Sequence, residues 1–314
     1  MISKISGIKS YISQYGLYIA FIVLCLLLTV LSPTFLTLGN VLNVLRQISI
    51  NGIIAIGMTL VIIIGGIDLS VGSIVALAAV TASSFAHPDT YPLIVAILVG
   101  LGVGLACGAI NGIIISFGKV APFIVTLGML TIVRGATLVY TGGRPVINLS
   151  DSYNRIGGGY VAGIPIPIYI LILIILIGIF ILKYTKFGRH VYAVGGNELA
   201  SKLSGLNINT VKICVYSFAG LMAGLSGVVL SSRVMAGSPA VGQGYELDAI
   251  AAVVIGGTSL SGGVGSVAGT IVGALIIGVM NNGLDLMNVS SYYQQIVKGI
   301  IIISAVLLDK KGAQ

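Results

Sequence analysis

The sequence has few charged residues and no tryptophan. Asp, Glu, Lys and Arg make up 8% of its 314 residues, whereas a soluble domain carries about 25%. So little charge cannot cover a water-facing surface, which excludes an ordinary soluble enzyme. Because 57% of the residues are hydrophobic, the composition predicts an all-α polytopic membrane protein that is surrounded by the lipid bilayer.

The sequence also has few residues that could carry chemistry. Three cysteines, Cys25, Cys107 and Cys214, lie in apolar segments without metal-ligand spacing, and His87 and His190 have no nucleophile–base pattern beside them. A phosphate-binding G-x-x-x-x-G-K-[ST] loop is missing as well. We therefore expect no catalytic residue, metal or cofactor in this chain.

Acidic residues are scarcer than basic ones, 8 against 16, which gives a net charge of +8. The basic residues are scattered among apolar spans and short loops, so we do not expect a nucleic-acid partner. Lys and Arg are enriched in the cytoplasmic loops of membrane proteins. This bias predicts a protein of the cell membrane with both termini in the cytoplasm. The residues predicted inside are Lys4, Lys9, Lys119, Lys183, Lys186, Arg189, Lys202, Lys212, Lys310 and Lys311; those predicted outside are Arg46, Arg144, Arg155, Arg233, Asp89, Asp151, Glu246, Asp248 and Asp285.

Long apolar runs are abundant, and each span needs about 20 largely apolar residues. Ten candidate transmembrane helices form one transmembrane domain over residues 1–314. They cover residues 15–32, 48–66, 69–86, 91–115, 120–139, 165–183, 211–231, 247–262, 263–282 and 292–308. The segment 247–262 is too short and too rich in glycine for an ordinary span, so we expect a broken or re-entrant helix there.

Glycine is plentiful, with 44 residues, and two stretches repeat it at every fourth position. One ladder runs from Gly100 to Gly112 and the other from Gly265 to Gly273. This spacing puts small residues on one helix face, so a neighbouring helix can approach closely, and packing is the favoured interpretation. Because the ladders lie five spans apart, they also indicate an inverted repeat. A second similarity, between residues 64–70 and 255–261, conflicts with the inverted repeat, because these stretches lie six spans apart and would run parallel. We interpret it as a glycine-bent helix end that both stretches share.

Asp68 is an acid inside a very apolar stretch, "IIIGGIDLSVGS". Gly65 and Gly66 can end one helix, and Asp68 or Ser70 can cap the next by accepting backbone N–H groups. Capping is the favoured interpretation, while direct participation in a solute route or an ion or proton relay stays open. The remaining candidates at helix breaks or in a pathway are Gly256, Gly257, Asn281 and Asn282. Arg134 is either functional or reaches the membrane surface, and Lys298 has no partner that the sequence identifies.

The longest polar connection covers residues 183–212. It is basic and rich in small residues, and it can form one or two short helices, with Asn197 or Ser204 as caps. A span-to-span connection needs only a few residues, so this one is large enough to be a docking surface. Taken alone, it could equally be a solvated linker.

Four stretches together resemble one family. "FGRHVYAVGGNELASKLSGLNINTVK" is similar to the cytoplasmic coupling loop of the ribose-type permeases of ABC importers. "GMTLVIIIGGIDLSVGS", "GYELDAIAAVVIGGTSLSGG" and "NNGLDLMNVSSYYQQIVKG" resemble the same family. These matches are collinear and run from the second predicted span to the last, so the resemblance covers nearly the whole chain.

The resemblance implies a set of partners and roles. Two permease copies would enclose a path, a separate cytoplasmic ATPase that binds ATP and Mg²⁺ would drive it, and an extracytoplasmic binding protein would deliver a simple sugar. D-ribose is the expected sugar, with autoinducer-2, another monosaccharide or nucleosides as alternatives. The outer loops 141–163 and 232–248 would meet the binding protein. The residues that would contact the ATPase are Gly195, Gly196, Asn197, Glu198, Ala200, Ser204 and Gly205.

We expect alternating access, in which closure of the ATPase pair moves the spans through the 183–212 loop. A rival of another class is an ion-coupled secondary transporter, which needs acids inside the spans. Only Asp68 clearly meets that need in the predicted arrangement. A passive channel or a membrane-embedded enzyme is a third, weaker alternative.

Overall fold

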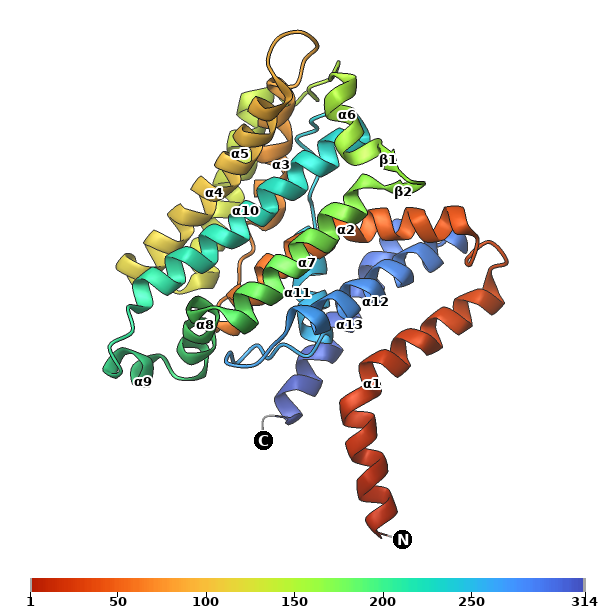
Figure 1. The fold of residues 1–314 in the computed structure, drawn as a ribbon, viewed down its shortest axis with the longest axis vertical. Helices are drawn as coiled ribbons and strands as arrows, with labels where there is room; N and C mark the ends of the chain where they lie inside the picture. The colour runs from red at the N-terminus through yellow and green to blue at the C-terminus, as the bar shows by residue number, and fades with distance from the viewer. Residues whose placement is uncertain (1, 313–314) are drawn as a thin grey trace.

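The protein is an assembly of helices with one small hairpin, seen in a computed structural model that describes residues 2–312 (Figure 1). The hairpin joins Tyr160 to Pro165 and Val161 to Ile164. In chain order the elements are α1 (Ile2–Leu31), α2 (Leu38–Ile63), α3 (Val71–Ser84), α4 (Leu93–Gly118), α5 (Pro122–Thr141), α6 (Asp151–Gly158), β1 (Tyr160–Val161), β2 (Ile164–Pro165), α7 (Ile166–Tyr184), α8 (Lys186–Gly196), α9 (Glu198–Leu203), α10 (Ile208–Val234), α11 (Tyr245–Ile255), α12 (Val267–Leu286) and α13 (Ser291–Gly312).

The predicted architecture, an all-α protein with many spans, is confirmed. Within the described chain, six helices are long and apolar enough to cross a membrane: α2, α4, α5, α7, α10 and α12. Two shorter apolar helical stretches are Gly16–Leu31 of α1 and the whole of α3. The inverted repeat and the total of ten spans remain predictions.

Several predicted boundaries differ from the structure. Helix α2 begins at Leu38, ten residues before the predicted start at 48. Its first part contains the polar residues Asn40, Asn43 and Arg46, so a search for apolar runs does not detect it. The predicted span 247–262 is the eleven-residue helix α11, which ends at Ile255. The basic connection contains two helices, α8 and α9, as expected.

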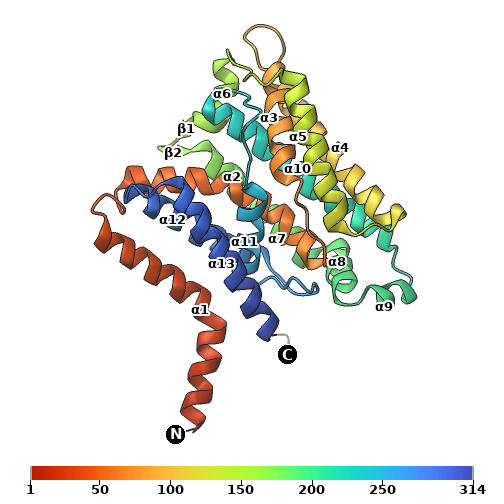
Figure 2. The ribbon, with the colours of Figure 1, turned by 180° about the vertical axis from the view of Figure 1, so that it is seen from behind.

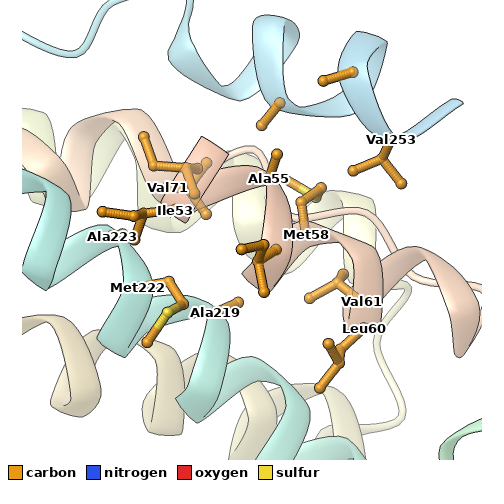
Figure 3. Packing of buried hydrophobic residues seen from close by; sticks show 14 of the residues in the cluster. Ile53, Ala55, Met58, Leu60, Val61, Val71, Ala219, Met222, Ala223 and Val253 are labelled. Carbon is orange, nitrogen blue, oxygen red and sulfur yellow. The ribbon is translucent and has the colours of Figure 1, made fainter. Parts of the chain in front are cut away.

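Helix α2 forms the centre of the packing. From Gly52 to Ile63 every residue is buried. Figure 3 shows Ile53, Met58 and Leu60 of α2 among side chains of α3, α10 and α11. Lipid is as apolar as these side chains, so close van der Waals contact holds the helices together more than exclusion of water does.

The first glycine ladder packs α4 against α10, as the packing interpretation predicted. A Cβ atom built on Gly104 would lie 2.7 Å from the Cα atom of Gly224, and one on Gly108 would lie 3.0 Å from the Cα atom of Gly220. The second ladder works in the same way, because Gly269 and Gly273 contact Gly256 and Ala252 at the end of α11. Both ladders therefore bring helix backbones into direct contact.

The two ends of the helix assembly carry different elements (Figures 1 and 2). Helix α6 and the hairpin lie at one end, while α8, α9, the start of α1 and the end of α13 lie towards the other. The side chains of Lys4, Lys9, Lys310 and Lys311, which contribute to the predicted inside charge, lie outside the described residues.

The segment between α10 and α11 runs as a non-helical strand along α3 and into the assembly (Figure 1). Gly237 exchanges two backbone hydrogen bonds with Val146, at 2.8 and 2.9 Å. Further along, the Arg134 guanidinium donates to the carbonyls of Pro239 and Val241, at 2.8 and 2.9 Å. Non-helical backbone at membrane depth needs such partners. Arg134 therefore holds this segment in place.

This path corrects the predicted outer loop 232–248. Only its beginning lies near the hairpin, and its end contributes the first turn of α11, where Glu246 and Asp248 lie. Asp248 is within 3.4 Å of Asn51 in the middle of α2. Asp248 is therefore buried within the helix assembly and does not lie in an exposed loop. The side of the membrane on which Glu246 and Asp248 lie stays a prediction.

Replacing Gly104 with alanine should destabilise the protein by about 1–3 kcal/mol, because the new methyl group must push α10 away from α4. Gly102→Ala is the matched control on the same helix, since a Cβ atom there meets no atom within 4 Å. Thermal unfolding of the detergent-solubilised chain measures both. Equal unfolding temperatures for the two variants would contradict the proposed helix contact.

Candidate functional site

Helix α2 ends in a glycine-based cap. The Gly66 N–H bonds to the Val61 carbonyl and the Gly65 N–H to the Ile62 carbonyl, both at 2.9 Å. Gly65 has φ of 75°, the left-handed conformation that glycine adopts without strain. This pair of bonds is the Schellman motif, which satisfies carbonyls that the helix leaves free.

Helix α11 ends in the same way. The Thr258 N–H bonds to the Val253 carbonyl at 3.1 Å, the Gly257 N–H bonds to the Val254 carbonyl at 2.9 Å, and Gly257 has φ of 85°. The similarity between residues 64–70 and 255–261 is thus a repeated helix end, as interpreted from the sequence.

The two capped ends meet each other and α8, and we call this contact the helix-end junction (residues 63–66, 195–196 and 256–266). The Gly263 N–H donates to the Ile63 carbonyl at 2.8 Å, which gives that carbonyl a partner from a different part of the chain. Gly195 of α8 packs against the same carbonyl, and a Cβ atom there would lie 2.7 Å from the Gly263 nitrogen. On the other side, the Tyr192 hydroxyl donates to the Gly265 carbonyl at 2.8 Å.

The junction includes a tyrosine that the sequence did not single out. Tyr192 lies on α8, and its partial burial raises the pKa of its phenol, so the group stays a neutral donor. Its sequence signal is weak, because it is one of three aromatic residues in the polar connection 183–212, together with Tyr184 and Phe187.

Asp68 fixes the turn between α2 and α3. Its fully buried carboxylate accepts the Ser70 backbone N–H at 2.9 Å and the Ser70 hydroxyl at 2.6 Å. The Asn111 side chain of α4 donates to that hydroxyl at 2.9 Å, and the Thr126 hydroxyl of α5 donates to the Ile67 carbonyl at 3.2 Å. These bonds tie the turn to two other helices. The capping interpretation was wrong, because Ser70 is the N-cap residue of α3 without a side-chain capping bond, and Asp68 accepts from Ser70 within the turn instead.

Helix α9 is a short protruding element with its own cap. The Asn197 side chain accepts the Ala200 N–H at 2.9 Å, which is one of the two predicted caps, whereas the Ser204 hydroxyl donates to the Ala200 carbonyl. The Lys212 ammonium pairs with Glu198 at 2.8 Å and fastens α9 to α10.

Two leucines make the surface of α9 unusual. Leu199 is 69% exposed and Leu203 is 82% exposed, on a helix otherwise flanked by polar residues. They are four positions apart, so they share one face. The sequence analysis did not single out Leu203, although this spacing was the available signal. An exposed apolar pair on a polar segment is typical of an interaction site.

The predicted site residues therefore separate into groups. Gly195 and Gly196 lie at the junction with Gly65, Gly66, Gly256 and Gly257, and Asp68 and Ser70 follow directly after it. Asn197, Glu198, Ala200, Ser204 and Gly205 belong to α9 and the chain that leaves it. Asn282 lies away from both groups and exchanges two 2.9 Å hydrogen bonds with Asn40 near the start of α2.

Lys298 has a clear partner. Its ammonium lies 3.0 Å from one oxygen of Asp248 and 3.1 Å from the other. Asp248 is thus an acid within the helix assembly, and the expectation that only Asp68 qualifies was wrong. Among the described residues, no group of three or more His, Cys, Asp or Glu side chains could hold a metal ion.

Comparison with known proteins identifies the family. The family described as "Branched-chain amino acid transport system / permease component" matches residues 40–306, which include both capped ends, α8 and α9. The chain belongs to this family. Its predicted resemblance to ABC importer permeases is thereby confirmed.

Individual relatives extend along almost the full chain. The ribose import permease protein of Escherichia coli (strain K12) is 47% identical over 96% of this chain and 95% of its own. The ribose import permease protein of Bacillus subtilis (strain 168) is 49% identical over 95% of this chain and 93% of its own. The L-arabinose ABC transporter permease protein of Azospirillum brasilense is 38% identical, covering 97% and 89%. No solved structure gives a significant match.

The junction makes a direct prediction for this family member. Gly195→Ala should break the Gly263–Ile63 hydrogen bond, because its methyl group has no room beside the Ile63 carbonyl. Amide hydrogen exchange in residues 262–266 should become faster by about tenfold or more. Gly196→Ala is the control, since a Cβ atom there meets no atom within 4 Å. Unchanged exchange in Gly195→Ala would refute the contact.

Proposed function

We propose that this chain is the permease subunit of an ABC importer that carries D-ribose across the cell membrane. The observation that carries this proposal is the 47–49% identity, over nearly the whole chain, to two ribose import permeases. The family description itself names amino acids, but a polyhydroxylated sugar is the better supported substrate, because the arabinose and allose permeases also match, each at 38% identity.

The coupling segment comprises α8 and α9 and meets a cytoplasmic ATPase. The exposed Leu199 and Leu203 give the partner an apolar anchor, and Lys202 adds a positive charge beside them. Because Gly195 touches the capped end of α2 and the loop after α11, movement of α8 reaches two helices without an intervening segment. ATP and Mg²⁺ bind in the ATPase, whose closure then drives alternating access.

The orientation follows from the same assignment. If α8 and α9 face the cytoplasm, the start of α1 and the end of α13 do so too, since Figures 1 and 2 place them towards that end. Ten crossings then result, with the strand after α10 and the short α11 together making the eighth. A second copy of the chain completes the path, and an extracytoplasmic binding protein contacts α6 and the hairpin.

Other substrates of the same importer class are autoinducer-2, a different monosaccharide or a nucleoside. An ion-coupled transporter is disfavoured, because Asp248 is paired with Lys298 and Asp68 is engaged in its turn. An ion-coupled transporter would work without an ATPase, so uptake measurements with and without the ATPase distinguish the two hypotheses.

Reconstitution tests the proposal. Proteoliposomes that hold the permease with its ATPase should take up radiolabelled ribose when ATP is inside and the loaded binding protein is outside. Omission of the ATPase should abolish uptake, and a protonophore should leave it unchanged. Uptake that persists without the ATPase, or that collapses with the protonophore at constant ATP, would contradict the importer assignment.

A substitution in the coupling segment sharpens this test. Gly196→Leu should reduce uptake by about tenfold or more, because its side chain projects from the free surface of α8 towards the ATPase, while the unfolding temperature stays the same. Gly135→Leu is the matched control, since its position on α5 also has open space around it. Normal uptake by Gly196→Leu would overturn the docking surface.

A further inference from the structure

Helix α2 carries a polar stripe in its outer half. Asn43, Gln47 and Asn51 follow one another at intervals of four, which places them along one face. Asn43 is exposed, and the other two are half-buried. The inner half of the same helix, from Gly52 to Ile63, contains one polar side chain, Thr59, which is fully buried and bonds to Thr270. The polar face of α2 thus extends from one end of the helix to its middle.

Helix α13 repeats this pattern. Gln294, Gln295 and Lys298 occupy its first eight residues, and the described positions that follow are predominantly apolar. Gln295 is exposed, whereas Gln294 bonds to Asp285 at 2.7 Å. The stripe again begins at the outer end and ends at a buried contact, the pair of Lys298 with Asp248.

Both stripes end at Asp248. This carboxylate is 7% exposed and lies in the first turn of α11, where the chain changes from a non-helical segment of turns to a helix. It receives Lys298 from α13 at 3.0 Å and the Asn51 amide from α2 at 3.4 Å. Broken helices at mid-membrane are a common setting for substrate sites in transporters.

A narrow cavity adjoins this carboxylate. Its lining includes Gln47, Asn51, Asp248 and Asn281. Asn281 is 6% exposed, and its side-chain oxygen has no hydrogen-bond partner among the described residues. A buried carbonyl without a partner costs free energy, so it points to a missing donor such as a hydroxyl group.

The half-exposed polar groups cannot face lipid. A charged or amide side chain at mid-membrane is expensive there, and such groups turn towards a water-filled path or a protein neighbour. Carboxamides can donate to and accept from sugar hydroxyls, and a carboxylate can accept from them. The rest of the cavity wall is apolar, with Ile48 and Ile277 as its largest side chains, and such surface suits the C–H faces of a sugar ring. The chemistry therefore fits a neutral polyhydroxylated solute.

We propose that Asn43, Gln47 and Asn51 line the outer half of the sugar path, and that Asn51, Asp248 and Asn281 bind sugar hydroxyls at its midpoint. This inference rests on the proposed function, since it identifies where the importer holds its cargo. Lys298 is a positioning residue whose ammonium, 3.0 Å from Asp248, holds that side chain in place. The cavity is narrow in this conformation, so α11 and α13 must separate from α2 when the sugar enters.

Thiol accessibility tests the path. In a chain whose three cysteines are replaced by alanine, Asn43→Cys and Gln47→Cys are made singly and assembled with the ATPase and the binding protein in proteoliposomes. A charged, water-soluble thiol reagent is added outside. Both positions should react about tenfold faster than Leu98→Cys, an exposed apolar position on α4 that faces lipid, because a thiol ionises in water and not in hydrocarbon.

Protection by sugar tests the binding site. Ribose delivered by its binding protein should slow the reaction at Gln47→Cys several-fold, and the added substitution Asn51→Leu should remove that protection. Thr131→Val, which removes a hydroxyl from the exposed surface of α5, is the control and should keep it. If the unmodified importer carries arabinose or allose and not ribose, that sugar replaces ribose, so failure of the ribose assignment is distinguished from failure of the site.

Two results would overturn the inference. Fast thiol labelling that no transported sugar slows would mean that the stripe is exposed to water but does not bind the sugar. Reaction at Gln47→Cys as slow as at Leu98→Cys would mean that a second copy of the chain covers the stripe.

Discussion

The structure depends on a requirement of every membrane protein, that backbone groups at membrane depth find partners inside the protein. Most of the chain meets it with uninterrupted helices. The exceptions are the ends of α2 and α11, where glycine caps satisfy the last carbonyls locally, and one carbonyl, that of Ile63, is satisfied by Gly263. This bond joins two helices that are far apart in sequence. Gly195 then adds α8 to the same contact, because only a residue without a side chain fits there.

Helix α11 connects this junction with the proposed sugar site. Asp248 lies at its start and Gly256 follows its end, a separation of eight residues, or about 12 Å along a helix axis. A displacement of α8 therefore needs only one short rigid helix to reach the carboxylate at mid-membrane. The strand before α11 has fewer constraints, namely the pairing of Gly237 with Val146 and the two bonds from Arg134. With the proposed ATPase docked on α8 and α9, this arrangement would provide a short mechanical route to the proposed sugar site.

Much of this arrangement could be predicted from the sequence. Long apolar runs predicted the spans, glycine spacing predicted that α4 packs closely on a neighbouring helix, and the similar stretches "IGGIDLS" and "IGGTSLS" predicted two bent helix ends. The buried position of Asp248 could not be predicted, because hydropathy detects long apolar helices and not a non-helical segment that enters the helix assembly. For the same reason, the partner of Lys298 and the role of Arg134 became clear only from three-dimensional contacts. The different packing of Gly195 and Gly196 could not be predicted either, because the sequence does not show which of two adjacent glycines is closely packed.

The central claim is that the helix-end junction moves as one body when the ATPase closes. Spin labels at Ala193 on α8 and Ser261 in the loop after α11, both exposed, report on the junction, and a second pair at Ala193 and Asp151 spans the molecule. Pulsed electron–electron distance measurements on the assembled importer, with and without ATP, compare the two pairs. The account predicts that the Ala193–Ser261 distance stays constant while the Ala193–Asp151 distance changes. A shift or broadening of the first distance, with the second unchanged, would contradict it.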